Sequence, residues 1–203
     1  MIAGARAAAS ADAALLYATI SSPLGELLVV GDGESLRALH LQAGSRPGAI
    51  GESWRRADQP FAAVRDQLDQ YFAGERSVFE LALAPSGTPF QGRVWRELQR
   101  IPYGQAISYS ELARRVGRPT AARAAGAANA RNPISILIPC HRVVGAGGGL
   151  SGYAGGIERK RRLLEFERGE RAVDGCSSPN GWINTPLTGR FSFGSRGGLK
   201  VGG

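Results

Sequence analysis

Residues 108–133 read SYSELARRVGRPTAARAAGAANARNP and contain two short helical segments separated by a Gly-Arg-Pro turn. The pattern predicts one helix at about 109–116 and a second helix that Asn132-Pro133 ends. Two short helices joined by a tight glycine-containing turn, in a basic stretch of chain, are typical of a helix-turn-helix. An ordinary pair of antiparallel helices has the same pattern, so the turn by itself leaves both interpretations open.

The second helix has an unusual composition, because its residues are almost all alanine and glycine, with Arg123 and Arg131 protruding. Small residues such as Ala122 and Gly126 let a helix backbone approach another surface closely. Too few long polar side chains are present to read many bases in a major groove, so the helix suits sequence-independent contact with a minor groove. The alternative is that the N-terminal part of the chain covers this helix.

Charge is distributed unevenly along the 203 residues. Residues 1–85 hold 7 Lys/Arg and 10 Asp/Glu, whereas residues 86–168 hold 14 and 5, which gives that part a net charge of +9. A strongly basic second half indicates contact with a polyanion. However, 23 of the 25 basic residues are arginine, and a generally arginine-rich proteome would produce the same bias.

The first half of the chain predicts a small α/β domain over residues 15–86. Residues 15–42 alternate apolar and β-branched residues with breakers, which favours short strands with a turn at 31–34. Apolar residues recur at helical spacing over 60–74, where Gly74 closes a helix. The stretch SVFELALA, residues 77–84, is a further strand candidate.

The second half predicts a mainly helical domain over residues 87–168. Thr88 and Pro89 suit the N-cap and first position of a helix that runs toward Ile101. Residues 157–169 predict a basic amphipathic helix with Leu163 and Leu164 facing inward. We expect residues 1–14 to be an extension, and the Gly/Ser/Pro-rich residues 169–203 to be a disordered tail in which Cys176 has no role.

A cysteine and a histidine are adjacent in ILIPCHRVVGAGGGLSGYAGG, residues 136–156. A zinc site is a weak interpretation, because adjacent Cys and His rarely serve as two ligands, and His40 and Cys176 would have to complete the set. A buried inert thiol would explain Cys140 but not the histidine beside it.

The third interpretation is a nucleophile, Cys140, with His141 as its base. That histidine would reach the thiol only through a turn or a bridging water, and it would need an acid to orient its other nitrogen. Spacing leaves three candidates for the acid: Glu158, Glu165 and Glu167. The glycine-rich loop that follows lacks a phosphate-binding signature and is expected to line a pocket.

Two cysteines in the chain imply no disulfide framework, which favours a reducing, cytoplasmic setting. No run of 18 apolar residues is present, so we expect no membrane span. Asp12 interrupts the alanine-rich start, which we therefore interpret as an extension and not as a signal peptide.

Four separated motifs, in this order and spacing, resemble the O6-alkylguanine-DNA alkyltransferases, also called methylated-DNA–protein-cysteine methyltransferases. The resemblance covers residues 88–168, and the N-terminal domain is similar in its ribonuclease-H-like outline only. The motifs are IPYGQAISYSELARRVG (101–117), RAAGAANARNP (123–133), PCHRVVGAGGGLSGYAGG (139–156) and ERKRRLLEFE (158–167).

The resemblance implies a role for each matching residue. Cys140 is the alkyl acceptor, His141 takes its proton through a water, and Glu167 orients that histidine. Asn132 ties the hinge between the second helix and the active-site loop. Tyr109 protonates the departing guanine and helps to rotate the nucleotide. Further matching positions are Arg123, which fills the stack when the base leaves, and the pocket wall Val143, Tyr153, Ala154 and Gly155.

The implied activity is stoichiometric, irreversible repair of O6-alkylguanine, chiefly O6-methylguanine, with O4-methylthymine as a further substrate. The implied partner is double-stranded DNA containing alkylated guanine, bound by a monomer, with no cofactor and no metal; whether several molecules bind side by side stays open. The main rival is a helix-turn-helix regulator or lesion-binding protein without chemistry, although Cys140 argues against the relatives that lack the acceptor. A papain-like thiol hydrolase is the weakest alternative.

Overall fold

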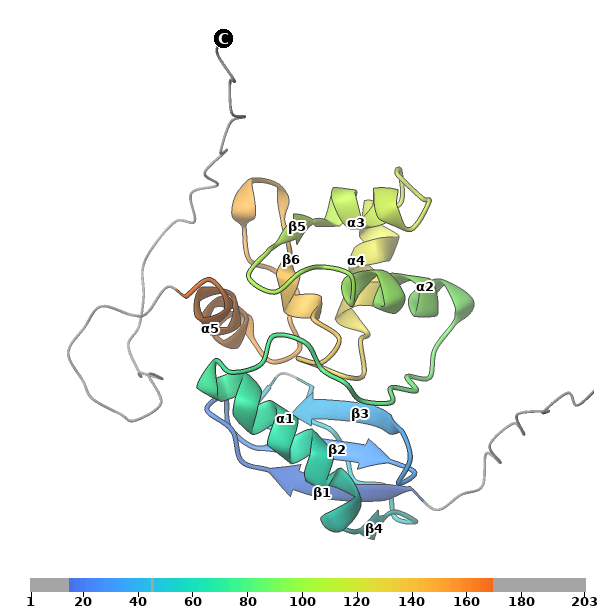
Figure 1. Ribbon diagram of the computed structural model, residues 1–203. Helices are drawn as coiled ribbons and strands as arrows, with labels where there is room; N and C mark the ends of the chain where they lie inside the picture. Colours follow the sequence, from blue (N-terminus) through green and yellow to red (C-terminus); the bar gives the residue numbers. More distant parts are fainter. Residues whose placement is uncertain (1–14, 45, 170–203) are drawn as a thin grey trace, which may run out of the picture.

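The computed structural model describes residues 15–44 and 46–169. The predictions for the N-terminal extension, the C-terminal tail and Cys176 lie outside the described residues. The described chain forms an α/β N-terminal domain with a small sheet and a helix, joined to a mainly helical C-terminal domain (Figure 1). This arrangement confirms the fold class predicted from the sequence.

The N-terminal domain is a four-stranded sheet with the order β3-β2-β1-β4. Strands β1 to β3 are antiparallel neighbours, and the short β4 pairs in parallel with β1. Every residue of β2 is buried, since α1 lies across one face (Figure 1) and the loop around Gly48 packs against Leu28 on the other. The elements are β1 Leu16–Ile20, β2 Leu27–Gly31, β3 Leu36–Leu41, β4 Arg55–Arg56, η1 Gln59–Phe61 and α1 Ala62–Ala73.

Helix α1 follows the predicted apolar pattern and buries Val64, Leu68, Tyr71 and Phe72. It ends at Gly74, which adopts the left-handed conformation at φ 80° and donates hydrogen bonds to the carbonyls of the last turn. Glycine adopts this conformation without the steric penalty of a side chain, so the sequence located the end of the helix correctly.

The predicted strand over residues 77–84 is wrong. The segment makes one isolated bridge, Leu36 to Leu83, through backbone hydrogen bonds from Leu36 to Ala82 and from Ala84 to Leu36. The reason is competition for the free edge of β3, because Leu39 further along that strand bonds to residues 133–135 of the C-terminal domain. Two segments therefore share one edge, and neither forms a full strand.

The C-terminal domain begins with α2, whose start agrees with the sequence prediction. Thr88 and Gln91 form a reciprocal capping box, and Pro89 is the first helical residue. The elements are α2 Pro89–Leu98, β5 Ile107–Ser108, α3 Tyr109–Arg115, α4 Ala122–Ala130, η2 Cys140–Arg142, β6 Val143–Val144, η3 Ala146–Gly148 and α5 Ile157–Glu167. The two-residue strands β5 and β6 pair in parallel and place the start of α3 beside the segment that follows Cys140.

Helices α3 and α4 form the predicted helix pair, joined by a turn at Gly117. The inner side of α4 packs on α2 and α3 through Ala125, Ala128 and Asn129. Arg123, Ala124 and Ala127 on its other side are exposed. The N-terminal domain therefore leaves this outer face of α4 uncovered, which removes the alternative that it buries the helix.

One hydrophobic core runs through both domains and includes residues of the sheet, α1, α2, α4 and α5. Within the described residues, no helix is long and apolar enough to cross a membrane.

Candidate active site

Cys140 stands at the end of a tightly turned segment that Asn132 holds in place. The backbone N–H of Leu137 donates to the carbonyl of Ser135, which makes a three-residue turn around Ile136 at φ 71°. A β-branched residue rarely adopts a positive φ, so this turn is strained. The side-chain amide of Asn132 donates to the Ile138 carbonyl at 2.7 Å, and its oxygen accepts from the N–H of Ile134 at 3.0 Å. The buried amide of Asn132 thus stabilises the strained turn around Ile136, which precedes the candidate nucleophile.

The Cys140 thiol is buried at the first residue of η2, with 5% of the residue exposed. Burial raises the pKa of the thiol, while the hydrogen bond from Asn132 and the positive charge of Lys160 act in the opposite direction. The thiol therefore needs a proton acceptor to become a nucleophile at neutral pH.

His141 follows directly on η2 and is completely buried. Its Nε2 lies 2.9 Å from Oε1 of Glu167. Burial lowers the pKa of His141 in spite of the nearby carboxylate, so the ring is neutral at pH 7. A carboxylate only accepts hydrogen bonds, which places the proton on Nε2. Nδ1, which has no hydrogen-bond partner among the described residues, is then the nitrogen that can accept a proton.

Glu167, the last residue of α5, is the acceptor for four residues from three separate parts of the chain. Besides His141, Tyr71 donates its hydroxyl at 2.8 Å, Arg142 donates from Nε and Nη2 at 2.8 Å each, and the Gly104 N–H lies at 3.3 Å. Burial alone would raise the pKa of Glu167, but His141 and Arg142 hold it well below its usual range. The carboxylate is therefore ionised, and its charge is balanced chiefly by Arg142.

Gly104 allows this close approach. A Cβ at that position would lie 2.8 Å from the Glu167 carbonyl oxygen, and the residue has φ 74°. Both the space and the backbone conformation favour glycine here.

Lys160 is a further buried cation whose charge acts on Cys140. The residue is completely buried, and its Nζ donates to the carbonyls of Val143 at 2.6 Å and Ser151 at 2.8 Å. Burial lowers the pKa of Lys160 to about 8, with the thiol acting in the opposite direction. Lys160 thus ties both ends of the glycine-rich loop to α5 and keeps a positive charge near the thiol at neutral pH.

Two tyrosines flank the site. The Tyr153 ring packs edge-on against His141 with centroids 6.5 Å apart, and its hydroxyl is buried without a partner in the described structure. Tyr109, at the start of α3, donates its hydroxyl to the Ser151 carbonyl at 3.1 Å. Burial raises the pKa of both phenols, and the neighbouring Cys140 acts in the same direction. Tyr153 thus contacts the histidine beside the thiol, and Tyr109 contacts the glycine-rich loop.

The remaining predicted pocket residues belong to the same region. Val143 is completely buried on β6, Gly155 is buried, and Ala154 is half-buried. Gly126 of α4 lies under Tyr109, because a Cβ there would be 3.3 Å from the ring. This contact links the helix pair to the pocket.

The predicted DNA-binding residues do not all lie together. Arg123 is exposed in the first turn of α4, next to the half-buried Ala122. Arg131 is exposed at the opposite end of α4, where it lines a groove between the domains with His40 and Arg46.

Sequence reasoning missed several residues that contact the site, among them Tyr71, Arg142 and Lys160. Arg142 had a signal, since it is the next residue after His141. Lys160 sits in the run ERKRR and has the appearance of a solvated charge. Tyr71 comes from α1, 96 residues from its partner Glu167, and no local pattern connects the two.

The described residues contain no group of three or more His, Cys, Asp and Glu side chains placed to hold a metal ion. His40, considered above as a zinc ligand, lies in β3, and burial lowers its pKa.

Comparison with known proteins covers almost the whole described chain. Residues 15–85 match the model of the 6-O-methylguanine DNA methyltransferase ribonuclease-like domain, and residues 89–169 match that of the DNA-binding domain of the same family. The methylated-DNA–protein-cysteine methyltransferase of Methanosarcina acetivorans is 45% identical over 153 residues, which span 75% of this chain and 98% of that protein.

Solved structures agree with this similarity. Mycobacterium tuberculosis OGT in complex with DNA matches with a TM-score of 0.72 and 47% identity, over 76% of this chain and 93% of that one. The O6-methylguanine-DNA methyltransferase of Pyrococcus kodakaraensis matches with a TM-score of 0.53 and 27% identity, over 75% and 98% of the two chains. On these matches and on its two-domain fold, the chain belongs to the 6-O-methylguanine DNA methyltransferase family.

Proposed function

We propose that this protein repairs O6-alkylguanine, chiefly O6-methylguanine, in double-stranded DNA by transferring the alkyl group to Cys140. The observation that carries the proposal is the buried thiol at the head of a hydrogen-bonded His141–Glu167 pair, in a chain that matches methylated-DNA–protein-cysteine methyltransferases over both domains. A regulator that only binds DNA would have no use for this pair.

The transfer is a displacement at the alkyl carbon. His141 accepts the thiol proton at Nδ1 through a water, and Glu167 stabilises the imidazolium that forms. The thiolate of Cys140 attacks the alkyl carbon, a carbon–sulfur bond forms, and the bond between carbon and the guanine O6 breaks. Tyr109 donates a proton to the leaving guanine. Because a thioether has no easy route to hydrolysis, each molecule acts once, without cofactor or metal.

Access to the buried thiol requires the damaged base to leave the stack. Base extrusion costs a few kcal/mol, and Arg123 offsets part of this cost by occupying the vacated position. The exposed face of α4 carries only small side chains beside this arginine, which supports close approach to a minor groove. In this scheme residues 87–168 bind DNA and carry out the chemistry as a monomer, residues 15–86 support them, and the Val143, Tyr153, Ala154 and Gly155 wall encloses the base.

The decisive experiment is intact-protein mass spectrometry after mixing with a duplex that carries one O6-methylguanine. We expect a gain of one CH₂ unit that maps to Cys140 and saturates at one per molecule. Cys140→Ala should show no gain while its affinity for the duplex stays close to that of the wild type. A wild-type protein that binds the duplex without gaining mass would favour the lesion-binding or regulatory alternative.

A further inference from the structure

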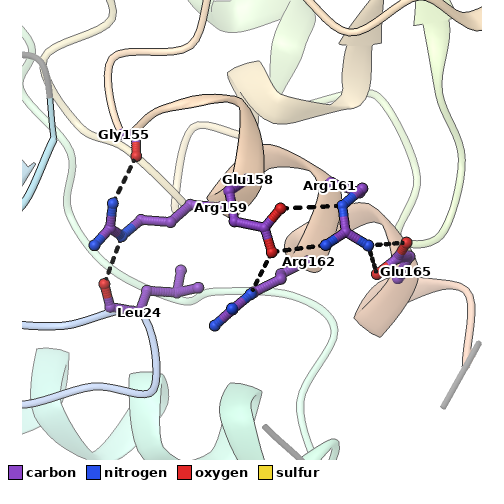
Figure 2. Close-up of polar contacts among 7 residues, drawn as sticks. All are labelled: Leu24, Gly155, Glu158, Arg159, Arg161, Arg162 and Glu165. Carbon is purple, nitrogen blue, oxygen red and sulfur yellow. Dashed lines mark hydrogen bonds and ion pairs between the residues drawn. The ribbon is translucent and has the colours of Figure 1, made fainter. Parts of the chain in front are cut away.

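Arg159, in the first turn of α5, connects the N-terminal domain to the pocket wall. Its guanidinium donates to three backbone carbonyls: Leu24 at 2.7 Å, Ala43 at 2.9 Å and Gly155 at 3.1 Å. The first two belong to loops that flank β2 and β3, and the third belongs to the wall. Figure 2 shows the bonds to Leu24 and Gly155 reaching in opposite directions from the same side chain.

The neighbouring arginines of α5 behave differently. Arg161 bonds to Glu158 at 2.6 Å and to Glu165 at 2.9 Å, and Arg162 bonds to Glu158 at 2.9 Å (Figure 2). These ion pairs join residues of one helix and stabilise it locally. Arg159 instead places a planar, multiply donating group between three segments of chain.

A second contact between the domains meets the wall at the same place. A Cβ at Gly44 would lie 2.5 Å from the Ala154 carbonyl oxygen and 3.1 Å from the Gly155 Cα. Leu41 of β3 also reaches Gly155, since a Cβ on that glycine would be 3.2 Å from the leucine Cδ1. The backbone of the N-terminal domain therefore rests directly against the wall.

This support is incomplete, because a groove of about 300 Å³ opens at the same seam. Ala154 and Gly155 line it from the wall side, and His40, Leu41 and Pro47 line it from the N-terminal domain. A wall segment that borders unfilled volume is held in position by its specific contacts more than by close packing.

We propose that Arg159 is a positioning residue that fixes the Ala154–Gly155 wall against the N-terminal domain and so restricts the size of the O6-alkyl group that the pocket accepts. The inference rests on the proposed function, because it needs this wall to border the alkylated base. Without the three hydrogen bonds the wall can move into the groove. Small adducts then lose some of their positioning, and bulky adducts gain room.

The test compares transfer from duplexes that carry O6-methylguanine or O6-benzylguanine. In Arg159→Gln we expect the ratio of benzyl to methyl transfer rate constants to rise about tenfold. Arg162→Gln removes the same charge from the same helix, where the arginine pairs with Glu158 of α5, and it should leave the ratio unchanged. An unchanged ratio in folded Arg159→Gln, or an equal rise in Arg162→Gln, would overturn the proposal.

A second variant, Gly44→Ala, should change the benzyl-to-methyl ratio in the opposite direction, and it leaves Arg159 in place. Gly44→Ala places a methyl group against the Ala154 carbonyl and pushes the wall away from the N-terminal domain, so the ratio should fall. If Arg159→Gln does not fold, this variant decides, and a ratio that does not fall contradicts the inference.

Hydrogen exchange separates failure of this inference from failure of the proposed function. The Gly156 N–H bonds to the Tyr153 carbonyl at 3.0 Å, and its exchange reports on the wall without any substrate. We expect faster exchange at this amide in Arg159→Gln than in Arg162→Gln. If the wild type transfers no alkyl group, this readout still tests the contact; if exchange is equal in both variants, the positioning role is refuted.

Discussion

Two regions of the C-terminal domain carry positive charge in opposite ways. Around Glu167 the charged groups are buried, and each is hydrogen-bonded: Arg142 has 6% of its surface exposed and bonds to the carboxylate and to the Ile101 carbonyl. On the outer face of α4, Arg123 is exposed beside small side chains. The buried cluster contributes to the fold as well as to the chemistry, whereas the exposed arginine can only act on a partner.

The physical reason for the difference is desolvation. A buried charge that loses its partner keeps the cost of burial without the compensating attraction. An exposed charge stays solvated when its partner is removed, so the protein loses little stability. Substitutions in the two regions should therefore separate effects on stability from effects on DNA repair.

The largest effect is expected for Glu167→Gln. This change leaves Arg142 buried without a negative partner, and it leaves a single amide oxygen to accept from Arg142, Tyr71 and His141. We expect the free energy of unfolding in urea to fall by about 3–5 kcal/mol, and the methyl-transfer rate constant to fall about a hundredfold or more. Glu111→Gln is the matched control, because Glu111 also bonds to two arginines but keeps 29% of its side chain exposed. A similar loss of stability in that variant would remove the contrast.

The same carboxylate predicts a pH dependence of stability. The pKa of Glu167 is lower in the folded protein than its ordinary value of about 4.3. As the pH falls, the carboxyl group is therefore protonated in the unfolded chain before it is protonated in the folded protein. The stabilisation by ionised Glu167 is complete above pH about 4.3 and is lost as the pH falls below that value. Urea unfolding between pH 6 and pH 3 should show a steeper loss for the wild type than for Glu167→Gln, and parallel curves would contradict this assignment.

Arg123→Ala should have an intermediate effect, confined to methyl transfer from duplex DNA. We expect about tenfold slower methyl transfer from duplex DNA, a smaller loss with a free O6-alkylguanine base, and a free energy of unfolding within about 0.5 kcal/mol of the wild type. Arg65→Ala, which changes a half-buried arginine of α1 that faces Asp58 at 3.8 Å, controls for the change in net charge. Equal losses on duplex and free base would exclude a role in extruding the nucleotide.

Tyr71→Phe should give the smallest effect, and it tests a single donor of the buried cluster around Glu167. It removes one donor to Glu167 and keeps the ring, which packs on Phe72, Phe79, Tyr103 and Phe166. We expect a loss of about 1 kcal/mol in unfolding free energy and a methyl-transfer rate constant that is lower by a small factor. Tyr103→Phe changes a neighbouring phenol that is partly exposed, and it should lower the unfolding free energy by less. A larger loss for Tyr103→Phe than for Tyr71→Phe would show that the Tyr71 hydroxyl does not support Glu167.

Local chemistry made much of the fold predictable. Thr88, Pro89 and Gln91 define the start of α2, because a capping box satisfies the free N–H groups of a helix within four residues. Gly74 ends α1 for an equally local reason. The candidate strand at residues 77–84 failed because its pairing depends on which other segment reaches the edge of β3, and that competition is not local.

The sequence by itself determined the helix pair, the adjacency of Cys140 and His141, and, through four motifs, the family to which the chain is similar. Spacing left the acid open among three glutamates of one helix, and the resemblance implied Glu167. The tertiary structure places Glu167 against His141, while Glu158 and Glu165 pair with Arg161 on the other side of α5. The burial of Lys160 and the hydrogen bond between Tyr71 and Glu167, which lie 96 residues apart, are likewise visible only in the structure. Such contacts depend on how the two domains pack, and a periodic or capping pattern holds no information about a partner so distant along the chain.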